Sequence, residues 1–369
     1  MAEKLFFNKF FANPFFKTFA SDESDLDTLV QTDAIEMLGQ EVRYDIYQPI
    51  RLLLQGDRGI GKTMAILYAK RIINEKKDLK IVIEDTTGLD TSFSSLPRFL
   101  QKINEKVYGR INIEKVIKMQ IKGTTFYEIA KEIDNSLGDM RVVVLLDVPD
   151  VESIHRHLNN LMETLQWIIY IQKFAIILAL NYDQIKKFER HGTLLNKFTE
   201  VSMRKFTLEM TKQLIELRLK RFSEAKNNGL APFAEETIEL IHDITTGIPR
   251  AIIKSCSRLF VHASTNNIQL ITKKTALPIL NEHYAEDLIS MNEADITLRN
   301  QYLEIYKILK ENGGKIDEKL MLIEKIRERI GGSYISIRER LKKLEAWGVI
   351  STARDKDNMI AKQVYLRAG

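Results

Sequence analysis

The chain has 369 residues, of which 44% are hydrophobic and 28% are charged, and its formal net charge is +5. It is long enough to bury a large core and exceeds the size that one core usually serves, so we expect two or three domains. The single cysteine, Cys256, excludes an internal disulfide framework and a cysteine-based zinc cluster, which favours a reducing intracellular compartment.

Phenylalanines crowd the first nineteen residues. They stand at Phe6, Phe7, Phe10, Phe11, Phe15, Phe16 and Phe19. We expect these rings to pack on the core of the domain that follows; the alternative is a docking peptide for a partner protein. No basic region followed by an apolar run and a small-residue cleavage site is present, so no signal peptide is predicted.

The longest apolar stretch does not predict a membrane span. It covers residues 165–180 and is interrupted by Gln172 and Lys173, which leaves it too short and too polar to cross a bilayer. We therefore expect a soluble, cytoplasmic protein without membrane contact.

A phosphate-binding loop is predicted at residues 56–63, which match the pattern G-x-x-x-x-G-K-[ST]. A short apolar run at 50–55 precedes it and a segment of helical composition, 64–74, follows it, so the loop joins a strand to a helix. Lys62 should reach the β- and γ-phosphates of a nucleoside triphosphate, and the Thr63 hydroxyl should bind Mg²⁺. The alternative is a glycine-rich turn that happens to precede a helix. We expect the nucleotide to contact Gly56, Asp57, Arg58, Gly59, Ile60, Gly61, Lys62, Thr63 and Met64.

Further strands are predicted at 79–84, 141–147, 174–181 and 200–204, and helical patterns fill 96–133. The run at 141–147 is almost unbroken in aliphatic residues, as in a strand covered on both faces of a parallel sheet. Strands that alternate with helices predict an α/β domain whose polar strand ends cluster at one edge.

Two of these strands end in polar side chains. Asp147 is expected to orient the Mg²⁺ shell, and Asn181 to hold water or the γ-phosphate. Their plain alternatives are an acidic strand end and a turn-forming asparagine. The residue after Asp147 is Val148, where many ATPases have a water-activating glutamate, so Asp150 or Glu152 would have to substitute.

From residue 207 only helices are predicted, at 207–223, 234–245, 250–265 and 273–284, with a linker near 291–295. The Thr-Gly-Ile-Pro-Arg sequence at 246–250 forms a turn that places Arg250 in the first turn of a helix, where it could reach a triphosphate; an ordinary surface arginine is the alternative. The predicted domains are 1–205, 206–292 and 293–369.

The last segment carries the positive charge. From Arg299 onward it has 16 Lys and Arg against 10 Asp and Glu. Its pattern predicts helices at 298–311, 318–330 and 336–347 and strands at 349–352 and 363–366, which suggests a winged helix. The residues expected to contact duplex DNA are Ser336, Arg338, Arg340, Lys342, Lys343, Arg354 and Lys356. Charged helix faces are usually only solvated, and winged helices also dock proteins.

Taken together, the motifs resemble those of the AAA+ ATPases, within the initiator-like group that includes archaeal origin-recognition proteins and transposition or DNA-loading ATPases. Residues 56–63 match Walker A, Asp147 matches the Walker B aspartate, Asn181 matches sensor 1 and Arg250 matches sensor 2. The resemblance implies a P-loop AAA+ parallel-sheet domain, a helical lid and a C-terminal winged helix, with ATP and Mg²⁺ as cofactors.

The resemblance also implies assembly into a homo-oligomer with ATP or DNA, in which an arginine finger completes the neighbouring site. Arg190 and Lys197 are the candidates in the corresponding region. Because Val148 replaces the usual glutamate, we expect ATP to be bound and hydrolysed slowly.

Three functions follow from these observations. The first is a protein that binds double-stranded DNA through the winged helix under control of the ATP state, as in replication initiation or mobile-element targeting. The second is a regulatory ATP switch whose winged helix docks a protein partner. The third is a remodeller or loader that turns over ATP in a ring, with Asp150 or Glu152 as the base.

Overall fold

The structure, a computed structural model, divides the chain into two compact units. One is Phe19–Lys205, and the other joins Met1–Thr18 to Phe206–Gly369. The residues described are 10, 12–16, 23–45, 48–76, 81–87, 95–148, 155–189, 194–223, 229–293, 296–316, 319–347, 349–354 and 362–366. Within this described part, no helix has the length and apolarity needed to cross a membrane.

The described part of the first unit contains a five-stranded sheet in the order β2-β3-β4-β1-β5, with every neighbouring pair parallel. The strands are β1 (Arg51–Gln55), β2 (Ile81–Thr87), β3 (Arg141–Asp147), β4 (Phe174–Leu180) and β5 (Thr199–Ser202). The aliphatic runs of β3 and β4 are buried on both faces, as such runs require in a covered parallel sheet. The predicted α/β fold class is confirmed.

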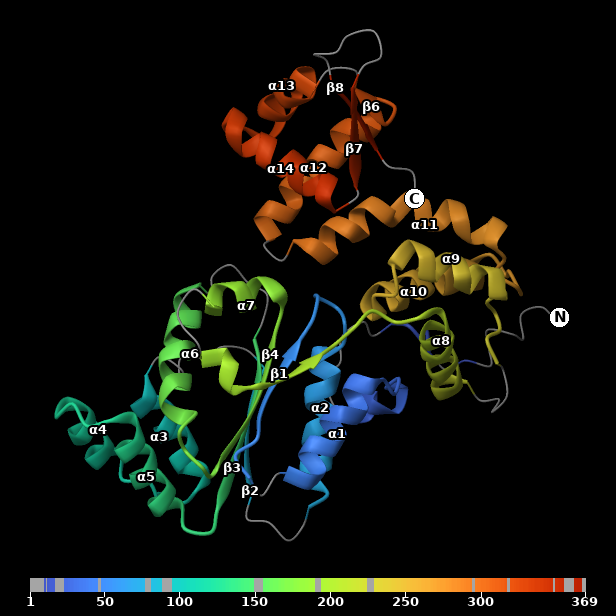
Figure 1. The fold of residues 1–369 in the computed structure, drawn as a ribbon. Helices are drawn as coiled ribbons and strands as arrows, with labels where there is room; N and C mark the ends of the chain where they lie inside the picture. Colours follow the sequence, from blue (N-terminus) through green and yellow to red (C-terminus); the bar gives the residue numbers. More distant parts are fainter. Residues whose placement is uncertain are drawn as a thin grey trace. The chain divides into compact units, whose positions relative to one another are not determined.

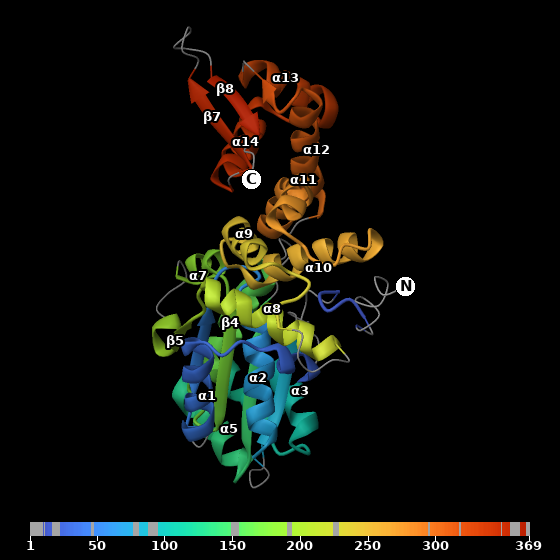
Figure 2. The ribbon, with the colours of Figure 1, turned by 90° about the vertical axis from the view of Figure 1, so that its right-hand side faces the viewer.

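Helices cover both faces of this sheet (Figures 1 and 2). Val142, Val144 and Leu146 of β3 pack into a core with α3, α5 and α6, whereas Val143 and Leu145 pack into a second core with α1 and α2. This alternation follows from the two-residue period of a strand. The elements are the 3₁₀ turn η3 (Glu23–Thr28), α1 (Asp33–Asp45), α2 (Lys62–Asn74), α3 (Leu96–Lys106), α4 (Ile113–Ile121), α5 (Phe126–Leu137), α6 (His155–Ile168), α7 (Tyr182–Glu189) and the 3₁₀ turn η6 (Leu194–Lys197).

The second unit begins with α8 (Leu208–Phe222), α9 (Glu235–Thr245), α10 (Pro249–Thr265) and α11 (Lys273–Asn292). Helix α11 is longer than the predicted segment 273–284 and contains Pro278. A turn joins α9 to α10, and in it Gly247 has a φ of +73°. The backbone N–H of Phe206 donates a hydrogen bond to the carbonyl of Gly247, at 2.8 Å. Phe206, where the helical part of the second unit begins, is therefore hydrogen-bonded to the turn that precedes α10.

The N-terminal phenylalanines that the structure describes pack on these helices. The rings of Phe10 and Phe15 lie edge-on to Phe260, with centroids 5.2 and 6.3 Å away, and Phe15 also contacts Phe233 at 5.7 Å. The expectation that they pack on the sheet domain was wrong, because their aromatic partners lie beyond residue 206. Phe10 and Phe15 are buried, which gives no support to a docking peptide, although Phe16 is 60% exposed. Outside the described residues lie Phe6, Phe7, Phe11 and Phe19.

A C-terminal module follows, in which helices pack on an antiparallel sheet of order β6-β8-β7. Its elements are α12 (Ile296–Glu311), β6 (Lys315–Ile316), α13 (Lys319–Ile330), α14 (Tyr334–Ala346), β7 (Ile350–Arg354) and β8 (Lys362–Leu366). Buried Tyr302 meets Trp347 edge-on, with ring centroids 4.7 Å apart, so this tryptophan belongs to the core of the module. The short strand β6 was not predicted.

Candidate functional site

The loop at 56–63 connects β1 to α2 and has the backbone that its glycines permit. Gly61 is the N-cap of α2 with a φ of +109°, a conformation that other residues rarely adopt. A Cβ on Gly56 would stand 2.8 Å from the carbonyl oxygen of Met203, which follows β5. Glycine is therefore needed at Gly56 for close approach and at Gly61 for its left-handed conformation.

Lys62 extends over this loop. It is the first residue of α2, and its Nζ donates hydrogen bonds to the carbonyl oxygens of Gly56, at 2.8 Å, and Asp57, at 2.9 Å. An ammonium group thus lies beside a helix N-terminus, whose backbone N–H groups carry partial positive charge. This arrangement suits an anion such as a phosphate.

Thr63 and Asp147 come together from α2 and β3. The Thr63 hydroxyl donates a hydrogen bond to Asp147 Oδ2 at 2.5 Å. A hydroxyl and a carboxylate are oxygen ligands of the kind that Mg²⁺ binds together with substrate phosphates. The pair fits the predicted metal role, and the bound ion would supply charge neutralisation at the β- and γ-phosphates.

The strand register explains why these groups meet. Asp147 is paired with Ala179 of β4, and Gln55 of β1 is paired with Leu180, so the loop, the carboxylate and Asn181 follow neighbouring strands at one edge of the sheet. Ligands of open parallel sheets bind at this carboxyl edge.

Asn181 caps helix α7. Its Oδ1 accepts a hydrogen bond from the backbone N–H of Gln184 at 2.8 Å, and its own N–H donates to Gln184 Oε1 at 2.8 Å. The turn-forming role that the sequence left open is therefore present, and contact with a phosphate stays a prediction.

The position after Asp147 is apolar. Val148 is 4% exposed and its N–H bonds the carbonyl of Ala179 at 3.3 Å, so its side chain belongs to the core. Asp150, Glu152 and Arg190 lie outside the described residues. Lys197, the other finger candidate, donates a hydrogen bond to the Tyr170 hydroxyl at 2.6 Å and lies over that ring.

Arg250 lies in the second compact unit, as the second residue of α10. It is half-buried and follows Pro249, which is well suited to a helix start. Its position in the first turn of a helix agrees with the sequence, and its role toward a triphosphate stays a prediction.

The predicted DNA-binding residues of α14 differ in exposure. Arg338, Lys342 and Lys343 are exposed, whereas Arg340 is half-buried and its Nη1 is enclosed beside Gly332. The Ser336 hydroxyl donates to the carbonyl of Ser333 at 3.1 Å within the helix cap. The side chain of Arg354 and the whole of Lys356 lie outside the described residues.

The exposed cations create a positive field on α14. The pKa of Glu339 is held below its usual value by a hydrogen bond from Lys342, 2.7 Å long, and by the charges of Arg338 and Lys343. An exposed ion pair of this kind is weak, so a phosphate can replace the carboxylate as the partner of Lys342.

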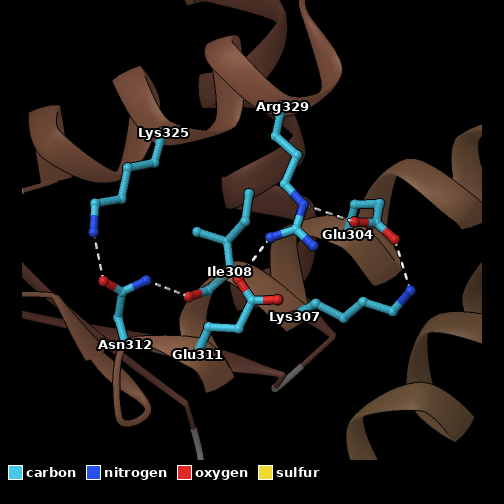
Figure 3. Close-up of polar contacts among 7 residues, drawn as sticks. All are labelled: Glu304, Lys307, Ile308, Glu311, Asn312, Lys325 and Arg329. Atoms are coloured by element: carbon cyan, nitrogen blue, oxygen red, sulfur yellow. Dashed lines mark hydrogen bonds and ion pairs between the residues drawn. The ribbon is translucent and has the colours of Figure 1, made fainter.

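Two cations of α13, Lys325 and Arg329, make contacts with other side chains of the module (Figure 3). Arg329 bridges two carboxylates of α12, Glu304 at 3.1 Å and Glu311 at 2.6 Å, and Lys325 bonds the side-chain amide of Asn312. These contacts join α13 to α12. Arg329 and Lys325 are therefore held by groups on or just after α12, and the exposed cations Arg338, Lys342 and Lys343 lie on α14.

Gln184 is a site residue that the sequence analysis missed. It is 5% exposed, and its Nε2 donates to the carbonyl of Val148 at 3.3 Å while the rest of the side chain caps α7. The Asn-x-x-Gln spacing after a strand, a form of the capping box, was the available signal.

Comparisons with known proteins match this fold. The ORC1 protein of Aeropyrum pernix, solved in complex with DNA, aligns over 95% of both chains with a TM-score of 0.55 and 12% identity. The ORC2 protein of Aeropyrum pernix, solved as ADPNP-ADP complexes, aligns over 90% of this chain and 88% of its own, with a TM-score of 0.48 and 13% identity. Cdc6p of Pyrobaculum aerophilum aligns over 96% and 93%, with a TM-score of 0.42 and 14% identity.

No protein-family model matches the chain, and no curated protein sequence matches it. Three observations indicate the same fold. They are the strand order, the loop at the carboxyl edge of the sheet, and the alignment to ORC1 along 95% of the chain. The chain therefore has the fold of the Aeropyrum pernix ORC1 protein, in agreement with the AAA+ fold class predicted from the sequence.

Proposed function

We propose that this chain binds ATP with Mg²⁺ at the 56–63 loop and binds double-stranded DNA through a C-terminal winged helix. We further propose that its affinity for DNA depends on the bound nucleotide. The observation that carries the proposal is the contact of the Thr63 hydroxyl with the Asp147 carboxylate, next to Lys62.

Nucleotide binding is tested by calorimetric titration of the full chain with ATP and with ADP in the presence of Mg²⁺. Lys62→Ala should weaken the affinities for ATP and for ADP by tenfold or more, because it removes the cation that contacts the phosphates. Thr63→Ala should weaken binding only when Mg²⁺ is present. Lys70→Ala, on the same helix α2, is the matched control and should leave both affinities unchanged. Wild-type protein that binds neither nucleotide would refute the proposal.

DNA binding is proposed for α14 because its exposed cations lie together on the C-terminal module. Arg338, Lys342 and Lys343 can each neutralise a phosphate and release its counterions. The fold comparison supports this, since the ORC1 protein was solved in complex with DNA. The order of helices and strands in the module is the one we expect of a winged helix.

The DNA test is an anisotropy titration of a labelled duplex at several salt concentrations. Arg338→Ala should weaken binding and lower the slope of log K against log salt by about 0.9, the loss of one phosphate contact. Lys310→Ala, which removes one exposed charge from α12, should change neither quantity. Equal effects of the two variants would assign binding to net charge rather than to α14.

Slow hydrolysis is proposed because a buried valine follows Asp147. ATP turnover should be far slower than nucleotide exchange, and Asp150→Asn or Glu152→Gln should show which carboxylate supports the residual activity. Assembly into a homo-oligomer is tested by light scattering with ATP and DNA together.

A protein-docking function is the second candidate, and one observation favours it. Ile335 on α14 is 73% exposed, and Leu320 and Met321 on α13 are 57% and 50% exposed. Contiguous patches of exposed apolar side chains mark protein interfaces, and these three residues are the candidates for such a patch. If this module docks a protein, Ile335→Ser will abolish capture of that partner, and duplex affinity will be negligible even at low salt.

A further inference from the structure

Gln184 links the two strand ends that carry Asp147 and Asn181. One end of its side-chain amide, Nε2, donates to the carbonyl of Val148, the residue directly after Asp147 on β3. The other end, Oε1, accepts from the backbone N–H of Asn181, directly after β4. The side chain is almost fully buried and its bond to Val148 forms away from water, where a lost partner is costly.

The same residue sets the orientation of the Asn181 amide. The backbone N–H of Gln184 can only donate, so the group that faces it at 2.8 Å is the Asn181 carbonyl oxygen, Oδ1. Because the amide oxygen faces the α7 backbone, the NH₂ group of the same amide points away from α7. An NH₂ group, unlike the oxygen, can donate to an anionic phosphate.

We infer that Gln184 is a positioning residue, which holds Asn181 with its NH₂ group toward the γ-phosphate and fixes it relative to Asp147. This inference rests on the proposed nucleotide binding. A contact made only with the γ-phosphate favours ATP over ADP, so Gln184 supports discrimination between the two nucleotides rather than affinity for both.

The test compares wild type with Gln184→Glu. A glutamate at this place in a helix retains the cap on α7, since its carboxylate accepts from the Asn181 N–H, but it loses the donor to Val148. Affinities for ADP and for the slowly hydrolysed analogue ATPγS are measured by calorimetry. Glu128→Gln is the matched control, because Glu128 closes the corresponding capping box with Thr125 on α5.

We expect Gln184→Glu to weaken ATPγS binding roughly tenfold while ADP binding changes less than twofold, and Glu128→Gln to leave the ratio unchanged. The double variant Asn181→Ala/Gln184→Glu should bind ATPγS no more weakly than Asn181→Ala alone, because both changes remove one interaction. Partial unfolding would lower both affinities together, so it cannot imitate this result.

Two outcomes would overturn the inference. If wild type binds both nucleotides and Gln184→Glu keeps the wild-type ratio, or lowers both affinities equally, Gln184 is only a helix cap. If wild type binds neither nucleotide, the proposed function fails and the inference fails with it.

Discussion

At the scale of single residues, glycine decides how closely backbone segments approach. Gly247, which precedes α10, combines a φ of +73° with a position where an added Cβ would stand 2.2 Å from the carbonyl oxygen of Phe206. The backbone here cannot accept a side chain without moving either the turn or the first residue of the second unit's helical part.

We predict that Gly247→Ala destabilises the second unit by about 2–4 kcal/mol, from the left-handed φ and the backbone clash together. Urea unfolding followed by circular dichroism measures the loss. Gly313→Ala is the control, since Gly313 has a φ of +72° but nothing within 4 Å of the added carbon. Gly313→Ala should lower the free energy of unfolding by only about 1–2 kcal/mol. Equal losses in the two variants would contradict the role of the Phe206 contact.

The residues of the candidate site differ in how far they could be predicted from the sequence. The 56–63 loop and Asp147 could be proposed from the sequence because a loop motif and a strand end are local patterns. Gln184 was missed because its acceptor, the carbonyl of Val148, lies 36 residues away and is brought close only by the parallel pairing of β3 with β4.

At the scale of elements, buried aliphatic runs were predicted well. Strand β3 matches the predicted bounds, and α12 to α14 match within two residues. The partners of the N-terminal rings were not predictable, since Asn13 bonds Ser257 across 244 residues. Composition suggested that the phenylalanines pack on a core, and only the tertiary structure shows that Phe10 and Phe15 contact α10.

The segment around Phe15 should protect the buried thiol of α10. Cys256 is fully buried, which raises the pKa of its thiol and suppresses the reactive thiolate, and the neighbouring Ser257 accepts the bond from Asn13. We predict that a thiol reagent at pH 8 labels the native protein on the order of a hundredfold more slowly than the denatured one.

Phe15→Ala should accelerate this labelling, because it removes a ring that packs on Phe260 in α10. Phe16→Ala, which truncates a ring that is 60% exposed, is the control and should leave the rate nearly unchanged. Equal rates for Phe15→Ala and wild type would show that this segment does not secure α10.

The ion pairs between α12 and α13 predict a pH dependence. The pKa of Glu304 is lowered, chiefly by its hydrogen bond from Lys307 and further by Arg329. A lowered folded pKa means that the stabilisation is present above the unfolded value of about 4.3 and is lost as the pH falls below it. The effect is small because the pairs are partly exposed.

Fluorescence of Trp347, in a Trp167→Phe background, can follow melting of the C-terminal module alone. Glu304→Gln should melt below the parent at pH 7, and this difference should disappear as the pH falls from 5 to 3. A difference that stays constant over that range would contradict the assignment.

At the scale of the whole molecule, the 56–63 loop and the exposed cations of α14 belong to different compact units. The division after Lys205 lies where strand patterning stops in the sequence, and the three-domain boundaries stay a prediction. A helical region that begins at Phe206 joins the two proposed binding sites along the chain, with Arg250 as its proposed sensor of the γ-phosphate. The central claim is that this connection makes DNA affinity depend on the nucleotide.

That claim is tested most directly by titrating one labelled duplex with the full chain at fixed salt, in ATPγS with Mg²⁺, in ADP with Mg²⁺ and without nucleotide. We predict a difference of at least about fivefold in DNA affinity between the ATPγS and ADP states, and its loss in Arg250→Ala. Equal affinities in all three conditions, from protein that calorimetry shows to be nucleotide-bound, would contradict the account.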